Sequence, residues 1–286
     1  MGQASSSRKA APLRRSRDAS RIVLLYGFPI QVRGAQGLFG PARPPRARPL
    51  LQVEVLRQRQ VAGAASDGVS RVAGEGFELD ARARRLSCYV SPGARPSEVR
   101  EAVARLALLA LGWLAERLGP ARAAAPGGRV LLNLHGSAVL GRRGALVFCG
   151  HSGYGKTTIA TKLLAPWPQL EWDLAIASLA RPGAPRLLYV ERGLRRGLSA
   201  AAGAAAPPLA GLFWLRQARR FGFRPLAAPE AAARLLPPLH FHAAPQAVRR
   251  RLRLLRELLE AVPCRELSFA KRRGPLVKLL REEGYL

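Results

Sequence analysis

Cysteine is scarce in this chain of 286 residues, and its three cysteines stand far apart at positions Cys88, Cys149 and Cys264. Small secreted domains that depend on disulfides carry a denser and even set of cysteines, and structural zinc sites need closely spaced pairs. The sequence therefore argues against a disulfide framework and against a cysteine metal site. It favours a reducing compartment.

Long apolar runs are also missing. The longest one near a predicted helix, residues 106–111, is far shorter than the roughly 20 residues that span a bilayer. The basic N-terminus lacks the continuous apolar segment and the small-residue cleavage site of a secretory signal. We therefore expect a cytoplasmic protein without a transmembrane segment.

Acidic residues and lysines are the other scarce types. The chain has 18 acidic residues against 47 basic ones, of which 42 are arginines, so its formal net charge is +29. Such a charge attracts polyanions over long distances. However, the arginines accompany an excess of Ala, Gly and Pro, as in GC-rich coding sequences, and no nucleic-acid-binding motif or aromatic stacking platform accompanies them. We predict scattered surface arginines and no specific nucleic-acid site.

The first part of the chain divides into an arm and a small subdomain. Residues 1–20 are rich in Ser, Ala and Arg without apolar periodicity, which predicts a disordered basic arm. Residues 21–95 predict a mainly β subdomain. It begins with an apolar strand, its residues 51–55 alternate between apolar and polar types, and a strand pair flanks a turn at residues 81–85.

We expect residues 96–286 to form one further domain. A helix with an apolar stripe begins at Pro96 and ends at Gly119. A strand over residues 130–134 then leads into His135, and a glycine-flanked turn returns the chain in the opposite direction. This hairpin would bring His135 close to the segment that follows the second strand.

A glycine loop follows that second strand. The motif comprises Gly150, His151, Ser152, Gly153, Tyr154, Gly155, Lys156, Thr157 and Thr158. It has the Gly-x-x-x-x-Gly-Lys-Thr spacing of a phosphate loop, five apolar residues precede it, and an apolar-periodic segment that predicts a helix, residues 159–164, follows it. Glycines let several backbone N–H groups point at one anion, and the helix N-terminus adds its dipole. A chance glycine-rich turn before a helix is the alternative.

Two side chains of this motif have expected roles in nucleotide binding. We expect Lys156, as a solvent-facing loop cation, to reach the β- and γ-phosphates of ATP, and the Thr157 hydroxyl to ligate Mg²⁺. Downstream, residues 170–176 predict a strand that carries Glu171 and Asp173. Beyond it we expect helices over residues 209–218, 229–236 and 248–262, and a last strand over residues 264–269.

The segment Leu134-His135-Gly136-Ser137-Ala138-Val139, followed by the glycine loop, resembles the HPr kinase/phosphorylase family. In that family a His-Gly pair precedes a phosphate loop, and an acidic pair follows the loop helix. Residues 262–269 are similar to the closing strand of shorter HPr-kinase-like proteins found near peptide-modification gene cassettes. The resemblance covers roughly residues 129–286. It implies an α/β fold in which the small β subdomain precedes a phosphate-loop core shared with phosphoenolpyruvate carboxykinase, with a mixed sheet flanked by helices.

The resemblance also implies a function, namely ATP-dependent phosphorylation of a Ser or Thr hydroxyl on a peptide or small protein. His135 or Asp173 would orient or deprotonate the acceptor, and Asp173 would hold Mg²⁺ together with Thr157. The chain keeps only one residue of the family's acidic pair, Asp173, although Glu171 would point the same way from the same strand.

Several alternatives stay open at this stage. The missing second Asp favours a weak or inactive ATP-binding regulatory module, and the charge alone favours a basic nucleic-acid-binding ATPase. His135 is alternatively a structural histidine, and Asp173 a simple strand-end carboxylate. The sequence does not name the acceptor, and it leaves a homo-oligomer open.

Overall fold

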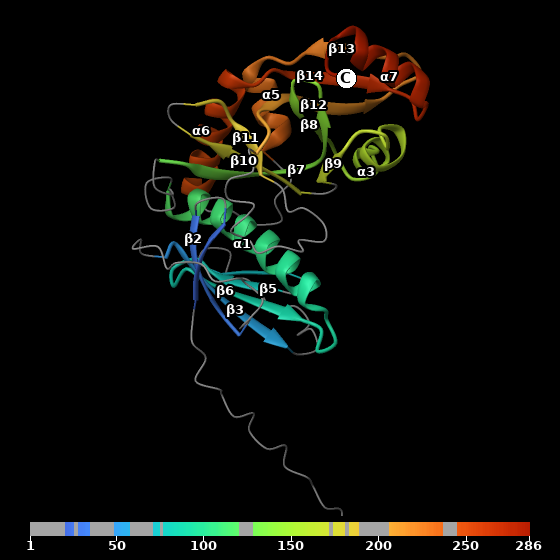
Figure 1. The fold of residues 1–286 in the computed structure, drawn as a ribbon. Coiled ribbons are helices and arrows are strands. Elements are labelled where there is room, and N and C mark those ends of the chain that lie inside the picture. The colour runs from blue at the N-terminus through green and yellow to red at the C-terminus, as the bar shows by residue number, and fades with distance from the viewer. Residues whose placement is uncertain are drawn as a thin grey trace, which may run out of the picture.

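The structure is a computed structural model that describes part of the chain. It covers residues 21–25, 28–34, 49–57, 71–74, 77–119, 128–171, 174–180, 183–188, 206–236 and 245–286. The expected basic arm, residues 1–20, lies outside these ranges. Two β-sheets and the helices that cover them form a mixed α/β fold (Figure 1). The α/β class predicted from the sequence is thereby confirmed.

The smaller sheet has six strands in the order β1-β2-β3-β6-β5-β4. The strands are β1 (Arg21–Leu25), β2 (Phe28–Arg33), β3 (Leu51–Arg57), β4 (Arg71–Gly74), β5 (Phe77–Asp80) and β6 (Arg85–Val90). The alternating residues Leu51, Val53 and Val55 of β3 are all buried, as the pattern predicts. The predicted strand pair around residues 81–85 is confirmed as β5 and β6, whereas β2 and β4 were not predicted.

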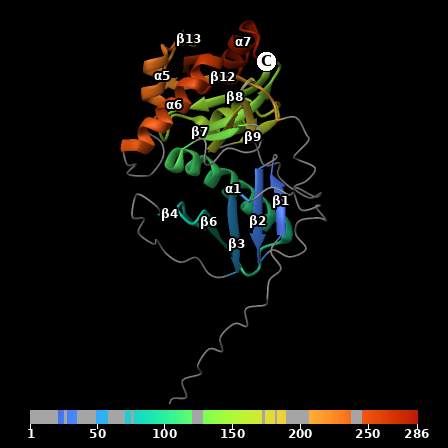
Figure 2. The ribbon, with the colours of Figure 1, turned by 90° about the vertical axis from the view of Figure 1, so that its left-hand side faces the viewer.

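Helix α1 (Pro96–Leu118) lies between the two sheets (Figures 1 and 2). Its predicted bounds are confirmed, with Pro96 in the first turn and Gly119 as the C-cap. The helix contacts β3 and β6 of the smaller sheet and β7 of the larger one. Every residue from Ala107 to Glu116 is buried, which is typical of a helix that packs on more than one side.

The larger sheet is mixed, with the order β11-β10-β7-β8-β12-β14-β13 and with β9 paired to β7. The strands are β7 (Val130–Gly141), β8 (Gly144–Cys149), β9 (Gln169–Glu171), β10 (Leu174–Leu179), β11 (Arg186–Leu188), β12 (Leu209–Gln217), β13 (Gly222–Pro225) and β14 (Cys264–Phe269). Strands β8, β12 and β14 run parallel at its centre, and the other pairs are antiparallel.

Helices cover this sheet on both faces. They are α3 (Lys156–Thr158), which continues as the π-helical turn η1 (Ile159–Leu163), and α5 (Ala228–Leu235), α6 (Pro245–Ala261) and α7 (Arg273–Glu282). Alternate residues of the central strands enter two hydrophobic cores, because successive side chains of a strand point to opposite faces. Val147 packs with α1, α5 and α6 in one core, and Phe148 packs with η1 and α7 in the other.

Two predictions of elements are wrong. Residues 209–218, expected as a helix, form the buried central strand β12. A strand covered on both faces reads as a continuous apolar run, so its sequence has no clear period of two. The single strand expected over residues 170–176 is instead β9 and β10, which pair with different parts of β7.

Within the described ranges, no helix combines the length and the apolar character that a membrane crossing demands.

Candidate functional site

The glycine loop, residues 150–155, begins where the central strand β8 ends. Every residue of β8 is buried between β7 and β12, so the start of the loop is fixed by hydrogen bonds on both sides. The loop then leaves the sheet, and the side chains from His151 to Tyr154 are exposed. The strand–loop–helix order predicted from the sequence is therefore present.

Two glycines give the loop its conformation. Gly153 and Gly155 have φ angles of 79° and 94°, in the left-handed region that disfavours other residues. Gly155 is also the N-cap of α3, and a Cβ atom there would lie 3.2 Å from Cζ of Phe269 in β14. Both the backbone angle and the close approach therefore require glycine at the point where the loop becomes a helix.

Lys156 lies inside the loop, which corrects the expectation of a solvent-facing cation. Its side chain is only 7% exposed. Its Nζ donates to the carbonyl oxygens of Gly150, at 2.9 Å, and of His151, at 3.1 Å. The ammonium thus turns back from the first residue of α3 to the start of the loop, and it fixes the two ends of the loop around one positive charge.

Further hydrogen bonds hold the middle of the loop and its helix. Gln217, at the end of β12, donates from Nε2 to the Gly153 carbonyl at 3.1 Å. The Thr161 hydroxyl donates to the Thr157 carbonyl at 2.8 Å. Leu164 N–H donates to the Ile159 carbonyl, five residues back, which defines the π-helical turn. The contact of Gln217 with the loop was not predicted, because its segment was expected to be a helix.

Aromatic rings flank the exposed part of the loop. The His151 ring makes T-shaped contacts with two other aromatic rings. The centroid distance is 5.3 Å to Tyr154 and 5.2 Å to Trp214 of β12. The Arg234 guanidinium of α5 lies over the Trp214 ring at 5.9 Å. These contacts link the loop to a group of arginines that sequence reasoning did not identify, because α5 and β13 are far from the motif in the chain.

That arginine group surrounds the carboxylate of Glu266 in β14, whose side chain is only 5% exposed. Arg234, Arg224 and Arg216 donate to it at 2.6, 3.1 and 3.3 Å. Burial raises the pKa of Glu266, but these hydrogen bonds and charges outweigh burial and bring the pKa to about 2. Glu230 accepts from Arg224 and Arg234 as well, so three arginines share two carboxylates beside the loop.

The structure places His135 near the loop by strand register. In β7, His135 pairs with Leu174 of β10, and the next residue, Gly136, pairs with Cys149, the last residue before the loop. The expected hairpin is confirmed, although its first strand extends through Gly141. The His135 side chain is half-buried.

The structure describes only one of the two acidic candidates, Glu171 and Asp173. Asp173 lies outside the described residues. Glu171 forms an ion pair with Arg105 of α1 at 3.3 Å, and the Glu171 side chain is 11% exposed. Within the described ranges, no group of three or more His, Cys, Asp or Glu is arranged to hold a metal ion.

Cys149 at the entrance to the loop is not a nucleophile in this arrangement. Its thiol is buried, and burial raises its pKa well above the ordinary value, so the neutral form dominates. Its function is to fill the core beneath the loop.

The glycine loop, the buried Lys156 and the neighbouring arginine group lie together at one end of the central strands, joined by the contact of His151 with Trp214 and of Trp214 with Arg234. Comparison with known proteins adds no assignment, because no family model and no curated protein sequence matches the chain.

Proposed function

We propose that the chain is an ATP-dependent kinase with a phosphate-loop core of the HPr-kinase-like type, which phosphorylates a Ser or Thr hydroxyl of a peptide or small protein. The observation that carries the proposal is the glycine loop with its lysine. A left-handed glycine starts the helix, and the Lys156 ammonium lies against the carbonyls at the loop's beginning. Loops of this geometry hold phosphate groups with backbone N–H groups and one lysine.

The residues present fit a nucleotide phosphate with Mg²⁺. The loop is exposed, and α3 begins at its end, so loop N–H groups and the helix dipole would both act on a phosphate bound there. Thr157, exposed in the first turn of the helix, and Asp173 would hold Mg²⁺, which neutralises phosphate charge when bound. Phosphoryl transfer depends mainly on positioning and charge stabilisation. His135 or Asp173 would orient the acceptor hydroxyl or take its proton.

The test is transfer of labelled phosphate from ATP to candidate acceptor peptides, together with calorimetric ATP binding. Lys156→Ala should abolish most binding and transfer, whereas Lys162→Ala, which removes an exposed lysine six residues later, should change neither. Because the substitution at position 156 leaves two carbonyls without their donor, at a cost of about 1–3 kcal/mol, thermal unfolding must be measured on both variants. Unchanged ATP affinity in folded Lys156→Ala would rule out the loop as the site.

The acidic residue is tested in the same assay. Asp173→Asn removes charge and basicity, so transfer should fall at least about a hundredfold while ATP binding survives in part. His135→Ala should show a smaller or comparable loss. Glu171→Gln should do little, because Glu171 is paired with Arg105.

An ATP-binding regulatory module is the second candidate, and the Glu171–Arg105 ion pair favours it. This pair ties Glu171, the carboxylate that could replace the missing Asp, to α1. Binding of Mg²⁺-ATP by the wild-type protein without transfer to any cognate peptide would select this function over the kinase.

A further inference from the structure

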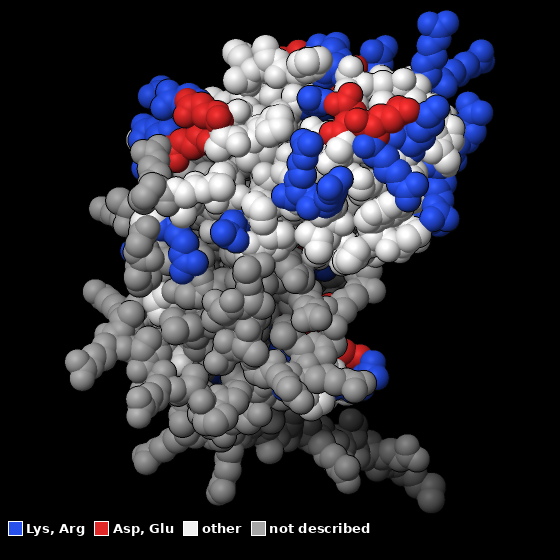
Figure 3. Space-filling model, turned by 45° about the horizontal axis from the view of Figure 1, so that its top comes forward, with Lys and Arg blue, Asp and Glu red and all other residues white. Residues whose placement is uncertain are grey.

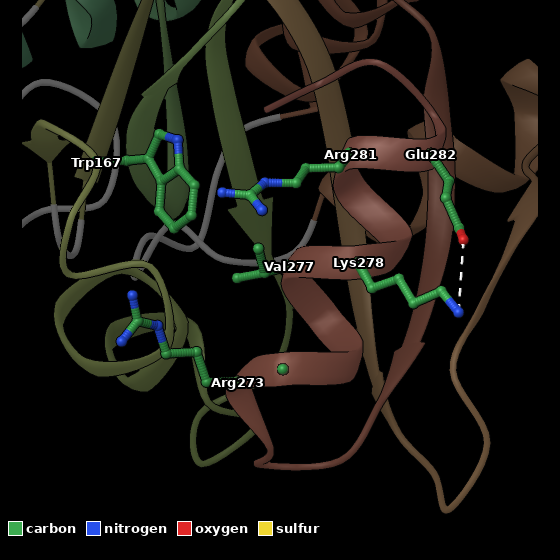
Figure 4. Close-up of a pocket in the computed structure, with 7 residues that line it drawn as sticks. Trp167, Arg273, Val277, Lys278, Arg281 and Glu282 are labelled. Carbon is green, nitrogen blue, oxygen red and sulfur yellow. Dashed lines mark ion pairs between the residues drawn. The ribbon is translucent and has the colours of Figure 1, made fainter.

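A groove lies between α7 and the residues that follow the loop helix (Figure 4). Its volume is about 570 Å³, and ligand clefts typically measure roughly 300–1,000 Å³. The side chains that define it are Trp167, Arg273, Val277, Lys278, Arg281 and Glu282. The floor belongs to the same hydrophobic core as the loop helix, because Trp167 and Val277 pack against that core.

The groove is positively charged on the side that faces Trp167. Arg273, Val277 and Arg281 stand four residues apart on α7, so they share one face of the helix, as Figure 4 shows. The Arg281 guanidinium lies over the Trp167 ring at 5.9 Å. Lys278 points away from this face toward Glu282, with which it forms an ion pair at 3.8 Å. Among the described residues, no ion pair involves Arg273 or Arg281.

The spacing of Arg273 and Arg281 matches the spacing of two side chains on one face of an extended peptide. Arg273 and Arg281 are eight residues apart, or about 12 Å along a helix. In an extended peptide, residues i and i+4 lie about 13 Å apart and share one face with residue i+2. Two carboxylates at i and i+4 would therefore meet the two arginines, and an apolar side chain at i+2 would meet Val277 and Trp167 between them.

We propose that this groove binds an extended acidic segment of a partner protein, with the pattern acid-x-apolar-x-acid. The proposal goes beyond the kinase function, since binding here needs neither nucleotide nor phosphoryl transfer. A second copy of this chain does not supply the ligand, because no two acidic residues in its sequence stand four positions apart. Nucleic acid is disfavoured by the apolar floor and by the single aromatic ring, one face of which Arg281 covers.

The experiment measures fluorescence anisotropy of the labelled peptide Ala-Asp-Ala-Leu-Ala-Asp-Ala with the full chain, without nucleotide. The wild type should bind it, and should bind the version with Asn in place of Asp at least about tenfold more weakly. The charge-reversed variant Arg273→Glu/Arg281→Glu should lose at least about tenfold in affinity, because like charges then face each other. The matched control Arg249→Glu/Arg253→Glu makes the same charge change on the exposed face of α6 and should stay within about twofold.

A further variant, Val277→Asp, places a carboxylate on the groove floor four residues from each arginine, where it would pair with both and should weaken binding by competing with the peptide. Four results would overturn the proposal: no binding by the wild type, equal binding of the Asn peptide, equal losses in the two charge-reversed variants, or displacement of the peptide by a short DNA duplex at lower concentration than by unlabelled peptide. Since no step involves ATP, failure of the kinase function would leave these results unchanged.

Discussion

Glu266 shows how a single carboxylate organises the positive charge beside the loop. Its oxygens accept from arginines of three elements, β12, β13 and α5. Without this carboxylate, three guanidinium groups would repel one another near the loop. The residue therefore stabilises the fold and keeps Arg234 over Trp214, whose ring contacts His151 of the glycine loop.

The low pKa of Glu266 predicts a pH dependence of stability. Its folded value of about 2 lies below the ordinary 4.5, so its contribution is fully present above about pH 4.5 and is lost as the pH falls toward 2. The shift corresponds to about 3 kcal/mol. Glu266→Gln should therefore lower the free energy of unfolding by about that amount at pH 7, and the difference from the wild type should shrink between pH 4.5 and 2.5.

Chemical denaturation at several pH values measures this difference. Glu260→Gln is the control, because Glu260 is exposed and contacts only Arg256, at 3.6 Å, among the described ion pairs. A difference between the wild type and Glu266→Gln that stays constant from pH 7 to 2.5 would contradict the assignment.

For single residues, the sequence predicts which ones form the glycine loop better than it predicts how deeply each side chain is buried. The spacing of Gly150, Gly155 and Lys156 was sufficient to locate the loop, because the spacing itself reflects backbone requirements. It was insufficient to show that Lys156 is buried, since the packing of the loop also involves Phe269 beside Gly155 and Gln217 bonded to Gly153, which come from strands far along the chain.

At the scale of elements, the close approach of α1 to β7 depends on Gly112. A Cβ atom at that position would lie 2.4 Å from Oδ1 of Asn133, which is buried and whose Nδ2 donates to the Leu109 carbonyl at 2.9 Å. The same side of β7 meets α6, because Arg251 donates to the Asn133 carbonyl and pairs with Glu116 of α1. These contacts fix how both helices lie on the sheet.

Gly112→Ala should consequently destabilise the protein, although Ala in a helix is ordinarily favoured over Gly by about 1 kcal/mol. We expect a loss of about 1–3 kcal/mol in the free energy of unfolding, the usual cost of overpacking a core. Gly93→Ala is the control, since its Cβ would meet nothing within 4 Å. The additional change Asn133→Ala should recover part of the loss. Stabilisation by Gly112→Ala would disprove the close approach.

Which elements can be predicted depends on how each one is buried. Helix α6 was predicted because only one of its faces is covered, which leaves a clear apolar stripe with arginines opposite. Strand β12 was mistaken for a helix because both of its faces are covered. Helix α7 was not predicted. Its first turn contains Gly274 and Pro275, a position where proline is tolerated.

At the scale of the whole molecule, the formal net charge is +29. Figure 3 shows Lys and Arg side chains in several separate groups over the face it presents, with acidic side chains among them. A nucleic-acid duplex is bound along a continuous basic stripe that follows its phosphates. This face therefore favours weak, non-specific attraction.

The corresponding prediction concerns salt. Any binding of a DNA duplex should weaken steeply as salt rises from about 0.05 M to 0.2 M, where non-specific phosphate contacts are largely lost. Electrophoretic mobility shifts with two unrelated duplexes measure both affinity and sequence preference. Tight binding of one duplex at about 0.2 M salt would contradict the prediction and favour a specific site.

The position of α1 has a consequence for cooperativity. The helix supplies part of the hydrophobic core to both sheets, with Val99 to Ala115 contributing to one continuous cluster that extends from β2 to β14. Unfolding of either sheet would expose an apolar face of α1 to water. The burial of α1 therefore stabilises both sheets at once. We therefore expect the two sheets to unfold together in a single thermal transition.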